Sequence, residues 1–383
     1  MDFSFTEEQN AIRDTAKRFA VEHLLPAYQQ REREGEMSRS AIKMMGELGL
    51  IGVELPEAFG GLGADCQTCG VIMEEISRGD FNMASIQIMA GLNGQMICDH
   101  AHADLAHEWV PRIISGDALV AIALTEPHAG SDAVNLKLEA RKSGDKYLLN
   151  GEKTSISLAT QADVTIVFAR TSDDGAHGVT AFLVPMDLPG ISTSAFNDVG
   201  GKSIGRGSIF FDQVEVPAKN VMGDVGQGFK IVMHGFDYSR VLIGMQCLGA
   251  AMQSVEETWA YVAEREAFGR PIAKFQGVSF PLAEAETDLA MGRFLCYEAL
   301  WRRDQSLPHT KEAAMCKWWA PKKAHDILIQ CVLLHGHAGW GDDYPHQQRM
   351  RDVMGLQIGD GTAQIQKMVI AREVAGKVTV SHV

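Results

Sequence analysis

The hydrophobic pattern of this chain changes its period twice, and this order constrains the fold more than any other feature. Residues 1–120 repeat apolar side chains at helical spacing, whereas residues 121–225 carry β-branched runs such as 164–168 (VTIVF). The helical period returns over residues 226–383. Helices, then strands, then helices do not make alternating βαβ units, so the pattern argues against a doubly wound parallel sheet. The sequence predicts an α+β protein of three domains with these boundaries.

Local signals predict where elements begin and turn. Thr6 followed by Gln9 forms a capping box, which predicts a helix start. Asn150-Gly151 predicts a tight hairpin turn between two strands. Residues 223–228 (GDVGQG) read GxxGxG rather than the GxGxxG of a dinucleotide loop, and we expect a glycine turn into the next helix there.

Charge and cysteine content exclude several classes of function. The formal net charge is −14, and a nucleic-acid binder would need a basic surface. No apolar run approaches the roughly 20 residues of a membrane helix, and the acidic N-terminus lacks the basic start of a signal peptide. The 7 cysteines are odd in number and lie mostly in apolar segments, which predicts reduced thiols and a cytoplasmic protein. Cys66 and Cys69 lack a second ligand pair, so we predict no metal site.

Three segments carry residues suited to chemistry. Residues 125–132 (TEPHAGSD) offer hydroxyls in a small-residue turn that could hold a heterocycle or a pyrophosphate, although a plain Asp/Ser turn reads the same way. Residues 265–271 (REAFGRP) end a helix and offer either an arginine fork for phosphate or a solvated terminus. Asp360 lies between two glycines after an apolar stretch, which suits a general base and equally an ordinary Asp-Gly turn.

Taken together, these segments resemble the FAD-dependent acyl-CoA dehydrogenase family over essentially the whole chain. The matching motifs occur in family order, and their joint occurrence is far more specific than any one of them. They are TEPxxGSD at 125–132, NGxK at 150–153, FxxVxVPxxN at 211–220, GxGF at 226–229, DxxR at 237–240, RxxFG at 265–269, Arg351-Asp352, and 359–362 (GDGT). The resemblance implies an N-terminal α domain, a β-barrel-like middle domain and a C-terminal four-helix bundle.

The resemblance also implies a role for each matched residue. Asp360 would be the catalytic base. The FAD contacts would come from Leu124, Thr125, Ser131, Ser155, Ser157, Arg265, Phe268, Gln276, Thr362 and Gln364. Among these, Arg265, Phe268 and Gln276 would reach the FAD of a neighbouring subunit, because the family commonly forms homotetramers. The substrate contacts would come from Asp237, Arg240 and Gly361. The electron acceptor would be electron-transferring flavoprotein.

Four residues depart from the family pattern. Ser155 stands where members usually carry a tryptophan packed against the flavin. His335 and His337 replace residues of a glycine-paired segment, and we interpret them as core or surface histidines rather than catalytic ones. Most members have Glu as the base, so Asp360 places its carboxylate about 1.5 Å further back.

The shorter base favours a substrate that fills the gap, either branched at Cα or cyclic. The chain resembles cyclohexane-1-carboxyl-CoA dehydrogenases, which share the Glu-to-Asp exchange. Residues 88–93 (IMAGLN) lack the distal acid of cyclohexene-carboxyl-CoA enzymes, and Phe81 stands near the position where glutaryl-CoA enzymes carry arginine. The alternatives are a short- or branched-chain acyl-CoA dehydrogenase or oxidase, and a non-catalytic flavin- or CoA-binding relative.

Overall fold

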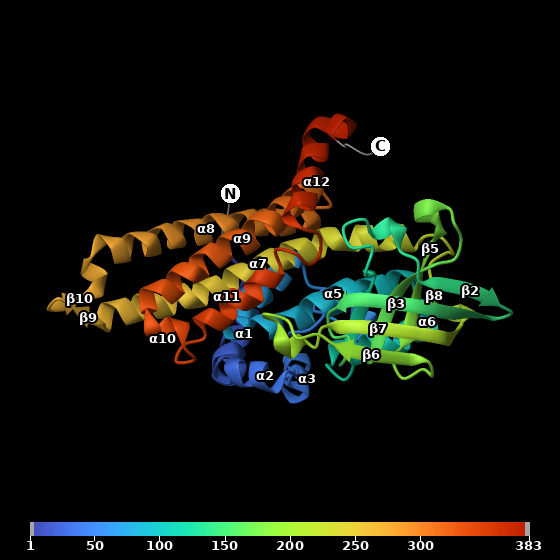
Figure 1. The fold of residues 1–383 in the computed structure, drawn as a ribbon, viewed down its shortest axis with the longest axis horizontal. Helices are drawn as coiled ribbons and strands as arrows, with labels where there is room; N and C mark the ends of the chain where they lie inside the picture. The colour runs from blue at the N-terminus through green and yellow to red at the C-terminus, as the bar shows by residue number, and fades with distance from the viewer. Residues whose placement is uncertain (1–3, 380–383) are drawn as a thin grey trace. The chain divides into compact units, whose positions relative to one another are not determined.

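A computed structural model describes residues 4–379, with helices at both ends of the sequence and strands in the middle (Figure 1). This order confirms the predicted succession of helices, sheet and helices. The N-terminal helices are α1 (Glu7–Phe19), α2 (Tyr28–Glu34), α3 (Arg39–Glu47), α4 (Cys66–Gly79), α5 (Phe81–His100) and α6 (Ala103–Ile114). The later helices are α7 (Gly228–Glu264), α8 (Gln276–Asp304), α9 (Thr310–His335), α10 (His337–Trp340), α11 (His346–Gly355) and α12 (Ala363–Ala375).

The strands form one large mixed sheet and one small hairpin. The large sheet contains β1 (Val120–Ala123), β2 (Glu139–Ser143), β3 (Lys146–Ile156), β4 (Val164–Arg170), β5 (Val179–Pro185), β6 (Ile191–Ala195), β7 (Gly207–Pro217) and β8 (Val221–Met222). Its order is β6-β7-β3-β2-β4-β5-β8, with β1 parallel to β4. The hairpin joins β9 (Glu266–Ala267) to β10 (Arg270–Pro271).

Contacts divide the chain into two compact units. The helical unit comprises residues 4–30, 65–85 and 237–379, and the sheet unit comprises residues 31–64 and 86–236. The N-terminal helices are therefore divided between the two units, whereas the sequence predicts that they form one domain. The division at residues 120 and 225 therefore stays a prediction.

The helical unit is built on long helices packed against one another. The capping box at the start of α1 is confirmed, since the Gln9 main-chain N–H donates to Thr6 Oγ1 and the Thr6 N–H donates to Gln9 Oε1, both at 3.1 Å. Helix α9 packs against α8, α11 and α12, and α4 packs between α1 and α8. Burial of the apolar stripes between these helices supplies most of the stabilisation of the unit.

The strands of the sheet unit explain its continuous apolar runs. Strands β4 and β5 are buried at every residue except the last, so both faces of the sheet are covered there. A strand buried on both faces reads as an uninterrupted run rather than an alternation. That is the pattern seen in residues 164–168.

The predicted hairpin turn at Asn150-Gly151 is wrong. Strands β2 and β3 turn at Gly144-Asp145, and Asn150-Gly151 lies inside β3, where the register with β7 shifts. Gly151 has φ +142°, and a Cβ there would come within 3.1 Å of Leu138. The glycine therefore serves a β-bulge and a close main-chain approach instead of a turn.

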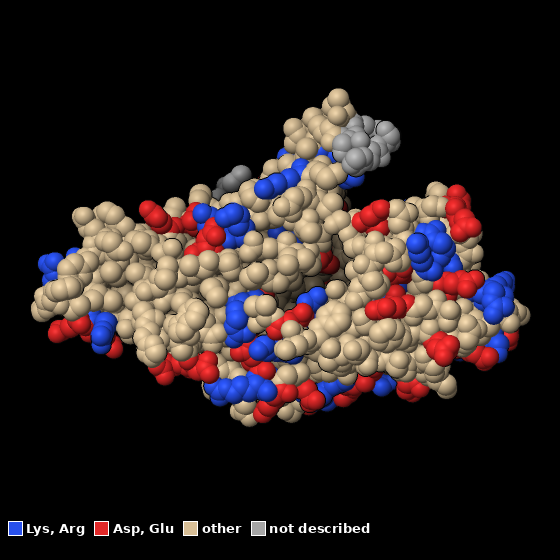
Figure 2. Space-filling model, viewed as in Figure 1, with Lys and Arg blue, Asp and Glu red and all other residues tan. Residues whose placement is uncertain are grey.

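The surface mixes both signs of charge. On the face seen in Figure 2, acidic and basic side chains are interspersed among uncharged residues. No helix within residues 4–379 combines the length and apolarity that crossing a bilayer requires.

Candidate active site

Asp360 lies in a strained loop between α11 and α12. Its φ is +58° and that of Gly361 is +89°, so two successive residues adopt the left-handed conformation. Aspartate tolerates this region better than most residues, but still at some cost. A side chain at Gly361 would be strained by its φ of +89°, and its Cβ would displace the Gln366 amide, whose Nε2 lies 2.5 Å from that position. The half-buried Asp360 carboxylate is thus presented by a backbone shape that only its surroundings can maintain.

Three buried side chains hold this loop. Ser239 on α7 donates its hydroxyl to Asp360 Oδ2 at 2.8 Å. Lys317 on α9 donates from Nζ to Leu356 O at 2.6 Å and to Gly361 O at 3.3 Å. Gln366 donates from Nε2 to the main-chain oxygens of Asp360 and Gly361, both at 3.3 Å. The loop is therefore tied to three helices through side chains that the sequence analysis did not single out.

Lys317 is a buried charge next to the predicted base. Its side chain is 1% exposed, and burial lowers the pKa of its ammonium to about 8, against the opposing attraction of Asp360. The ammonium is therefore mostly charged at pH 7 and loses its proton in the mildly alkaline range. In the sequence, its one signal is a lysine inside the apolar run 313–320 (AAMCKWWA).

The predicted substrate contacts lie on the same part of α7 as Ser239. Arg240 Nη1 donates to Asp237 Oδ1 at 2.8 Å, and Thr310 donates its hydroxyl to Asp237 Oδ2 at 2.6 Å. The structure thus brings the DxxR motif and Asp360 together through Ser239. Thr362 begins α12, where its hydroxyl caps the helix, and Gln364 is exposed on the first turn.

The predicted flavin turn of the sheet unit is held by a second buried lysine. Lys153 Nζ donates to Glu126 Oε1 at 2.7 Å and to Leu124 O at 3.0 Å. Burial lowers the pKa of Lys153 to about 8, although Glu126 favours its charged form. Burial also acts to raise the pKa of Glu126, but Lys153 and hydrogen bonds from two main-chain N–H groups outweigh it and leave that pKa below its usual value.

Ser155 and Ser157 follow Lys153 at the end of β3. The register between β3 and β7 shifts between Lys153 and Ile156, and Ser155 sits in this irregularity with φ +58° and an exposed side chain. Ser157 is half-buried just beyond the strand. The bulge explains how a short stretch can turn small polar side chains out of the sheet.

The hydroxyls and charges of this turn fit an FAD. Thr125 and Ser131 offer neutral hydroxyls, and Ser131 is exposed. The Glu126 carboxylate, which would repel a pyrophosphate, is 3% exposed and bound to Lys153. The flavin carbonyls and phosphates need such neutral donors. The exposed Asp132 carboxylate in the same turn accepts a hydrogen bond from the Asn135 amide.

The residues predicted to reach a neighbouring FAD lie far from Asp360. Helix α7 continues for 24 residues from Arg240 to Glu264, which at about 1.5 Å per residue is about 36 Å. Arg265, Phe268 and Gln276 follow this end, all with exposed side chains, and Phe268 is 94% exposed at φ +53°. These three residues and Asp360 therefore cannot serve one site of a single chain.

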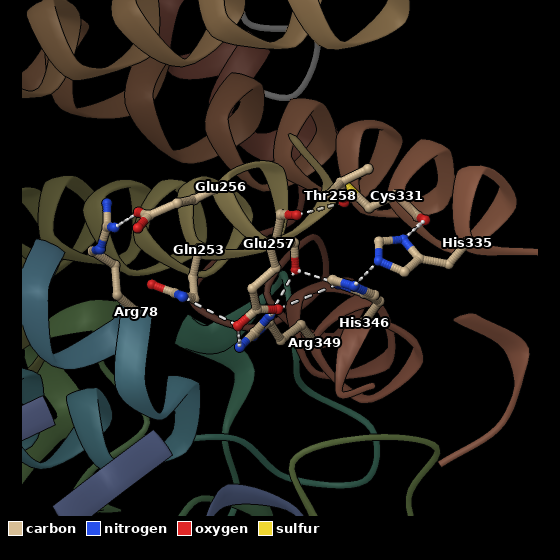
Figure 3. Close-up of polar contacts among 10 residues, drawn as sticks. Arg78, Gln253, Glu256, Glu257, Thr258, Cys331, His335, His346 and Arg349 are labelled. Carbon is tan, nitrogen blue, oxygen red and sulfur yellow. Dashed lines mark hydrogen bonds and ion pairs between the residues drawn. The ribbon is translucent and has the colours of Figure 1, made fainter. Parts of the chain in front are cut away.

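His335 belongs to a buried polar cluster at the same end of the helices (Figure 3). His346 Nε2 lies 3.2 Å from His335 Nε2, and His335 Nδ1 lies 2.9 Å from Cys331 O. Arg349 donates to both carboxylate oxygens of Glu257. Burial lowers the pKa of both histidines, that of His346 to about 3. His335 is therefore a neutral core residue.

His337 is exposed two residues beyond His335, at the start of α10. All seven cysteines are free thiols, and the described part of the chain contains no cluster of histidine, cysteine and carboxylate side chains that could hold a metal ion. The prediction of no metal site stays a prediction.

Comparison with known families gives three matches that together span most of the chain. The acyl-CoA dehydrogenase N-terminal domain matches residues 6–117, the middle domain matches residues 121–214, and the C-terminal domain matches residues 226–375. An acyl-CoA dehydrogenase of Bacillus subtilis is 36% identical over 374 residues, covering 97% of this chain and 99% of that protein.

Solved structures give the same result. Butyryl-CoA dehydrogenase from Megasphaera elsdenii is 31% identical with a TM-score of 0.94, covering 98% of this chain and 100% of that one. A glutaryl-CoA dehydrogenase from Mycobacterium smegmatis, solved in complex with FADH2, is 26% identical with a TM-score of 0.92, covering 97% of this chain and 96% of that one. The helix–sheet–helix order of this chain is thus the order of a known fold.

Proposed function

Because this chain belongs to the acyl-CoA dehydrogenase family, we propose that it oxidises an acyl-CoA thioester between Cα and Cβ with Asp360 as the base. It is an oxidoreductase of acyl-CoA thioesters, and FAD is its cofactor. One observation carries the assignment of the base. The Asp360 carboxylate projects from a left-handed residue between two glycines, and a fully buried hydroxyl binds one of its oxygens.

The reaction divides between a proton and a hydride. Asp360 takes the Cα proton of the thioester, and main-chain N–H donors at the thioester oxygen would stabilise the negative charge that develops there. When bound, FAD supplies the acceptor for the hydride that leaves Cβ. Arg240 and Asp237, linked to each other on α7, are the residues we assign to the acyl-CoA. Gly361 keeps the turn beside the base free of a side chain.

We propose an alicyclic substrate, cyclohexane-1-carboxyl-CoA, which would become cyclohex-1-ene-1-carboxyl-CoA. An aspartate carboxylate ends about 1.5 Å short of a glutamate carboxylate, so a substrate with a second carbon on Cα would fill the space. A misplacement of about 1 Å between base and proton can cost a hundredfold in rate. A linear chain would leave this gap.

A short linear or branched acyl-CoA is the second candidate. The similarity to butyryl-CoA dehydrogenase favours it. An oxidase would differ from both in its fast reaction with oxygen, and a non-catalytic relative would bind flavin or CoA without turnover. Retention of an acid at position 360 argues against the last.

Anaerobic bleaching of the flavin tests these proposals. We expect cyclohexane-1-carboxyl-CoA to bleach the purified yellow protein and butyryl-CoA to do so far more slowly. Bleaching by butyryl-CoA alone would select the second candidate, and fast recovery of colour in air would indicate an oxidase. Asp360→Asn should retain FAD and lose bleaching by at least about 100-fold, whereas Asp173→Asn, an exposed loop control, should behave as wild type.

We also propose that the chain works as a homotetramer and passes its electrons to electron-transferring flavoprotein. The exposed cluster Arg265, Phe268 and Gln276 lies about 36 Å along α7 from the predicted substrate contacts, which supports a role in a second subunit. Light scattering of the purified protein tests the assembly, and reduction of added electron-transferring flavoprotein tests the acceptor. A cytoplasmic location stays a prediction.

A further inference from the structure

We propose that Ser239 and Lys317 are positioning residues, which fix the orientation of the Asp360 carboxylate and supply the fixed positive charge beside it. This inference rests on the proposed role of Asp360 as the base. The backbone of the loop alone does not fix the direction of the Asp360 carboxylate, and the two buried side chains do so.

The loop needs external support because its own conformation is unfavourable. Asp360 and Gly361 both have positive φ, a backbone region that is unfavourable for a non-glycine residue such as Asp360. Residues 356–359 form turns that close on α11, and α12 begins only at Ala363. The carboxylate would therefore lose its direction if the ties to neighbouring helices were removed.

Ser239 fixes one of the two carboxylate oxygens. It is 0% exposed on the long helix α7, so its hydroxyl has a set position, and it donates to Oδ2 at 2.8 Å. Within residues 4–379, Oδ1 has no hydrogen-bond donor. The arrangement leaves Oδ1 as the oxygen that receives the Cα proton.

Lys317 fixes the backbone on both sides of the base. Leu356 O belongs to the residue that ends α11, and Gly361 O belongs to the residue that follows Asp360. One ammonium group thus connects the start of the loop to its end. Its positive charge also interacts favourably with the negative, C-terminal end of the α11 dipole. Gln366 adds a second tie to Gly361 O.

The charge of Lys317 acts on Asp360 without a direct ion pair. Within residues 4–379, Lys317 Nζ makes no direct ion pair, and Asp360 is the carboxylate whose charge attracts the ammonium most strongly. The charged and titratable groups around it are Asp360 on the loop, with Arg240 and the buried thiol of Cys247 on α7. Burial raises the pKa of Cys247, so this thiol stays protonated. Lys317 is the group of this cluster that loses its charge near pH 8.

The pH dependence of flavin reduction distinguishes positioning from a purely structural role. In wild type, the anaerobic bleaching rate should fall above about pH 8 as Lys317 loses its proton. The arginine of Lys317→Arg keeps its charge at every accessible pH. The bleaching rate of this variant should therefore begin to fall at a pH at least one unit higher than in wild type. Lys317→Met should bleach at least about 10-fold more slowly at pH 7 and lack this alkaline limb.

Controls separate these effects from loss of folding. FAD content and the melting temperature are measured for each variant, with Lys322→Met on the exposed face of α9 as the matched control. Ser239→Ala should retain FAD and bleach about 10-fold more slowly, because Oδ2 loses its donor. If Lys317→Met does not fold, two measurements still test the positioning roles. They are the alkaline fall of the bleaching rate in Lys317→Arg and the bleaching rate of Ser239→Ala.

The outcomes distinguish this inference from the proposed function. A wild-type protein that no acyl-CoA bleaches would overturn the proposed function and this inference with it. A wild type that bleaches, while Lys317→Arg keeps the wild-type alkaline limb and Ser239→Ala keeps the wild-type rate, would overturn the positioning roles alone.

Discussion

Each compact unit contains a fully buried lysine beside a predicted site segment, but the two ammonium groups have different partners. Lys153 in the sheet unit contacts the Glu126 carboxylate at 2.7 Å, and Lys317 in the helical unit contacts two main-chain carbonyls. Burial lowers both pKa values to about 8. A direct ion pair fixes a turn, whereas a lysine bound only to carbonyls keeps a charge that a nearby reacting group can feel.

Lys153→Met should remove the ion pair with Glu126 that holds the predicted flavin turn, and it should cause the largest loss of stability. Removing the ammonium leaves Glu126 buried without a countercharge, which typically costs about 3–5 kcal/mol. Urea unfolding at pH 7 measures this free energy, and FAD content should fall with it. Lys142→Met at an exposed position of β2 is the control and should change little.

The double variant Glu126→Gln with Lys153→Met sharpens this test. A neutral glutamine can still accept hydrogen bonds from the main-chain N–H groups of Lys137 and Leu138, so part of the lost stability should return. A double variant no more stable than Lys153→Met would contradict the role of the buried charge.

Lys317→Met should cost less stability than Lys153→Met, although we expect it to slow flavin reduction. It removes hydrogen bonds to two carbonyls and leaves no carboxylate in direct contact, so about 1–2 kcal/mol should be lost. The same urea titration measures it. A loss of stability equal to that of Lys153→Met would contradict the proposed difference between a lysine in an ion pair and a lysine bound only to carbonyls.

The smallest effect at neutral pH concerns His346 in the cluster of Figure 3. Its folded pKa is lowered to about 3, so the unfolded chain, with an ordinary value near 6.5, binds more protons between these two pH values. The free energy of unfolding should therefore fall as the pH drops from about 6.5 toward 3, with no contribution at pH 7.

Unfolding titrations at pH 7 and pH 5 on wild type and His346→Phe measure this contribution. The variant should lose less stability than wild type between the two pH values. His337→Gln, at an exposed position, is the control and should keep the wild-type difference. An unchanged difference in His346→Phe would show that another group is responsible for the acid sensitivity.

The sequence predicted the order of helices and strands and the start of α1, because each depends on neighbouring residues. It misplaced the hairpin at Asn150-Gly151, since the same glycine that suits a turn also suits a bulge inside β3. The family motifs identified Asp360, Asp237 and Arg240, because these residues keep fixed positions relative to recognisable neighbours.

The supporting side chains could not be found in the same way. Ser239 is a common residue inside a helix, and the apolar run around Lys317 indicates burial but not which groups the ammonium binds. The role of each depends on a partner that is distant in the sequence. Lys317 binds Gly361, which is more than 40 residues away, and Ser239 binds Asp360, which is more than 100 residues away. No local pattern encodes such pairs.

The amino-acid sequence by itself determined the helix–sheet–helix order, the family and the identity of the predicted base, because periodicity and motif spacing are local properties. The tertiary structure alone decided which buried groups surround that base and which partners the two lysines bind. The physical reason is that burial and hydrogen-bond partners depend on which distant segments pack together, and these set both the direction of a carboxylate and the protonation of an amine.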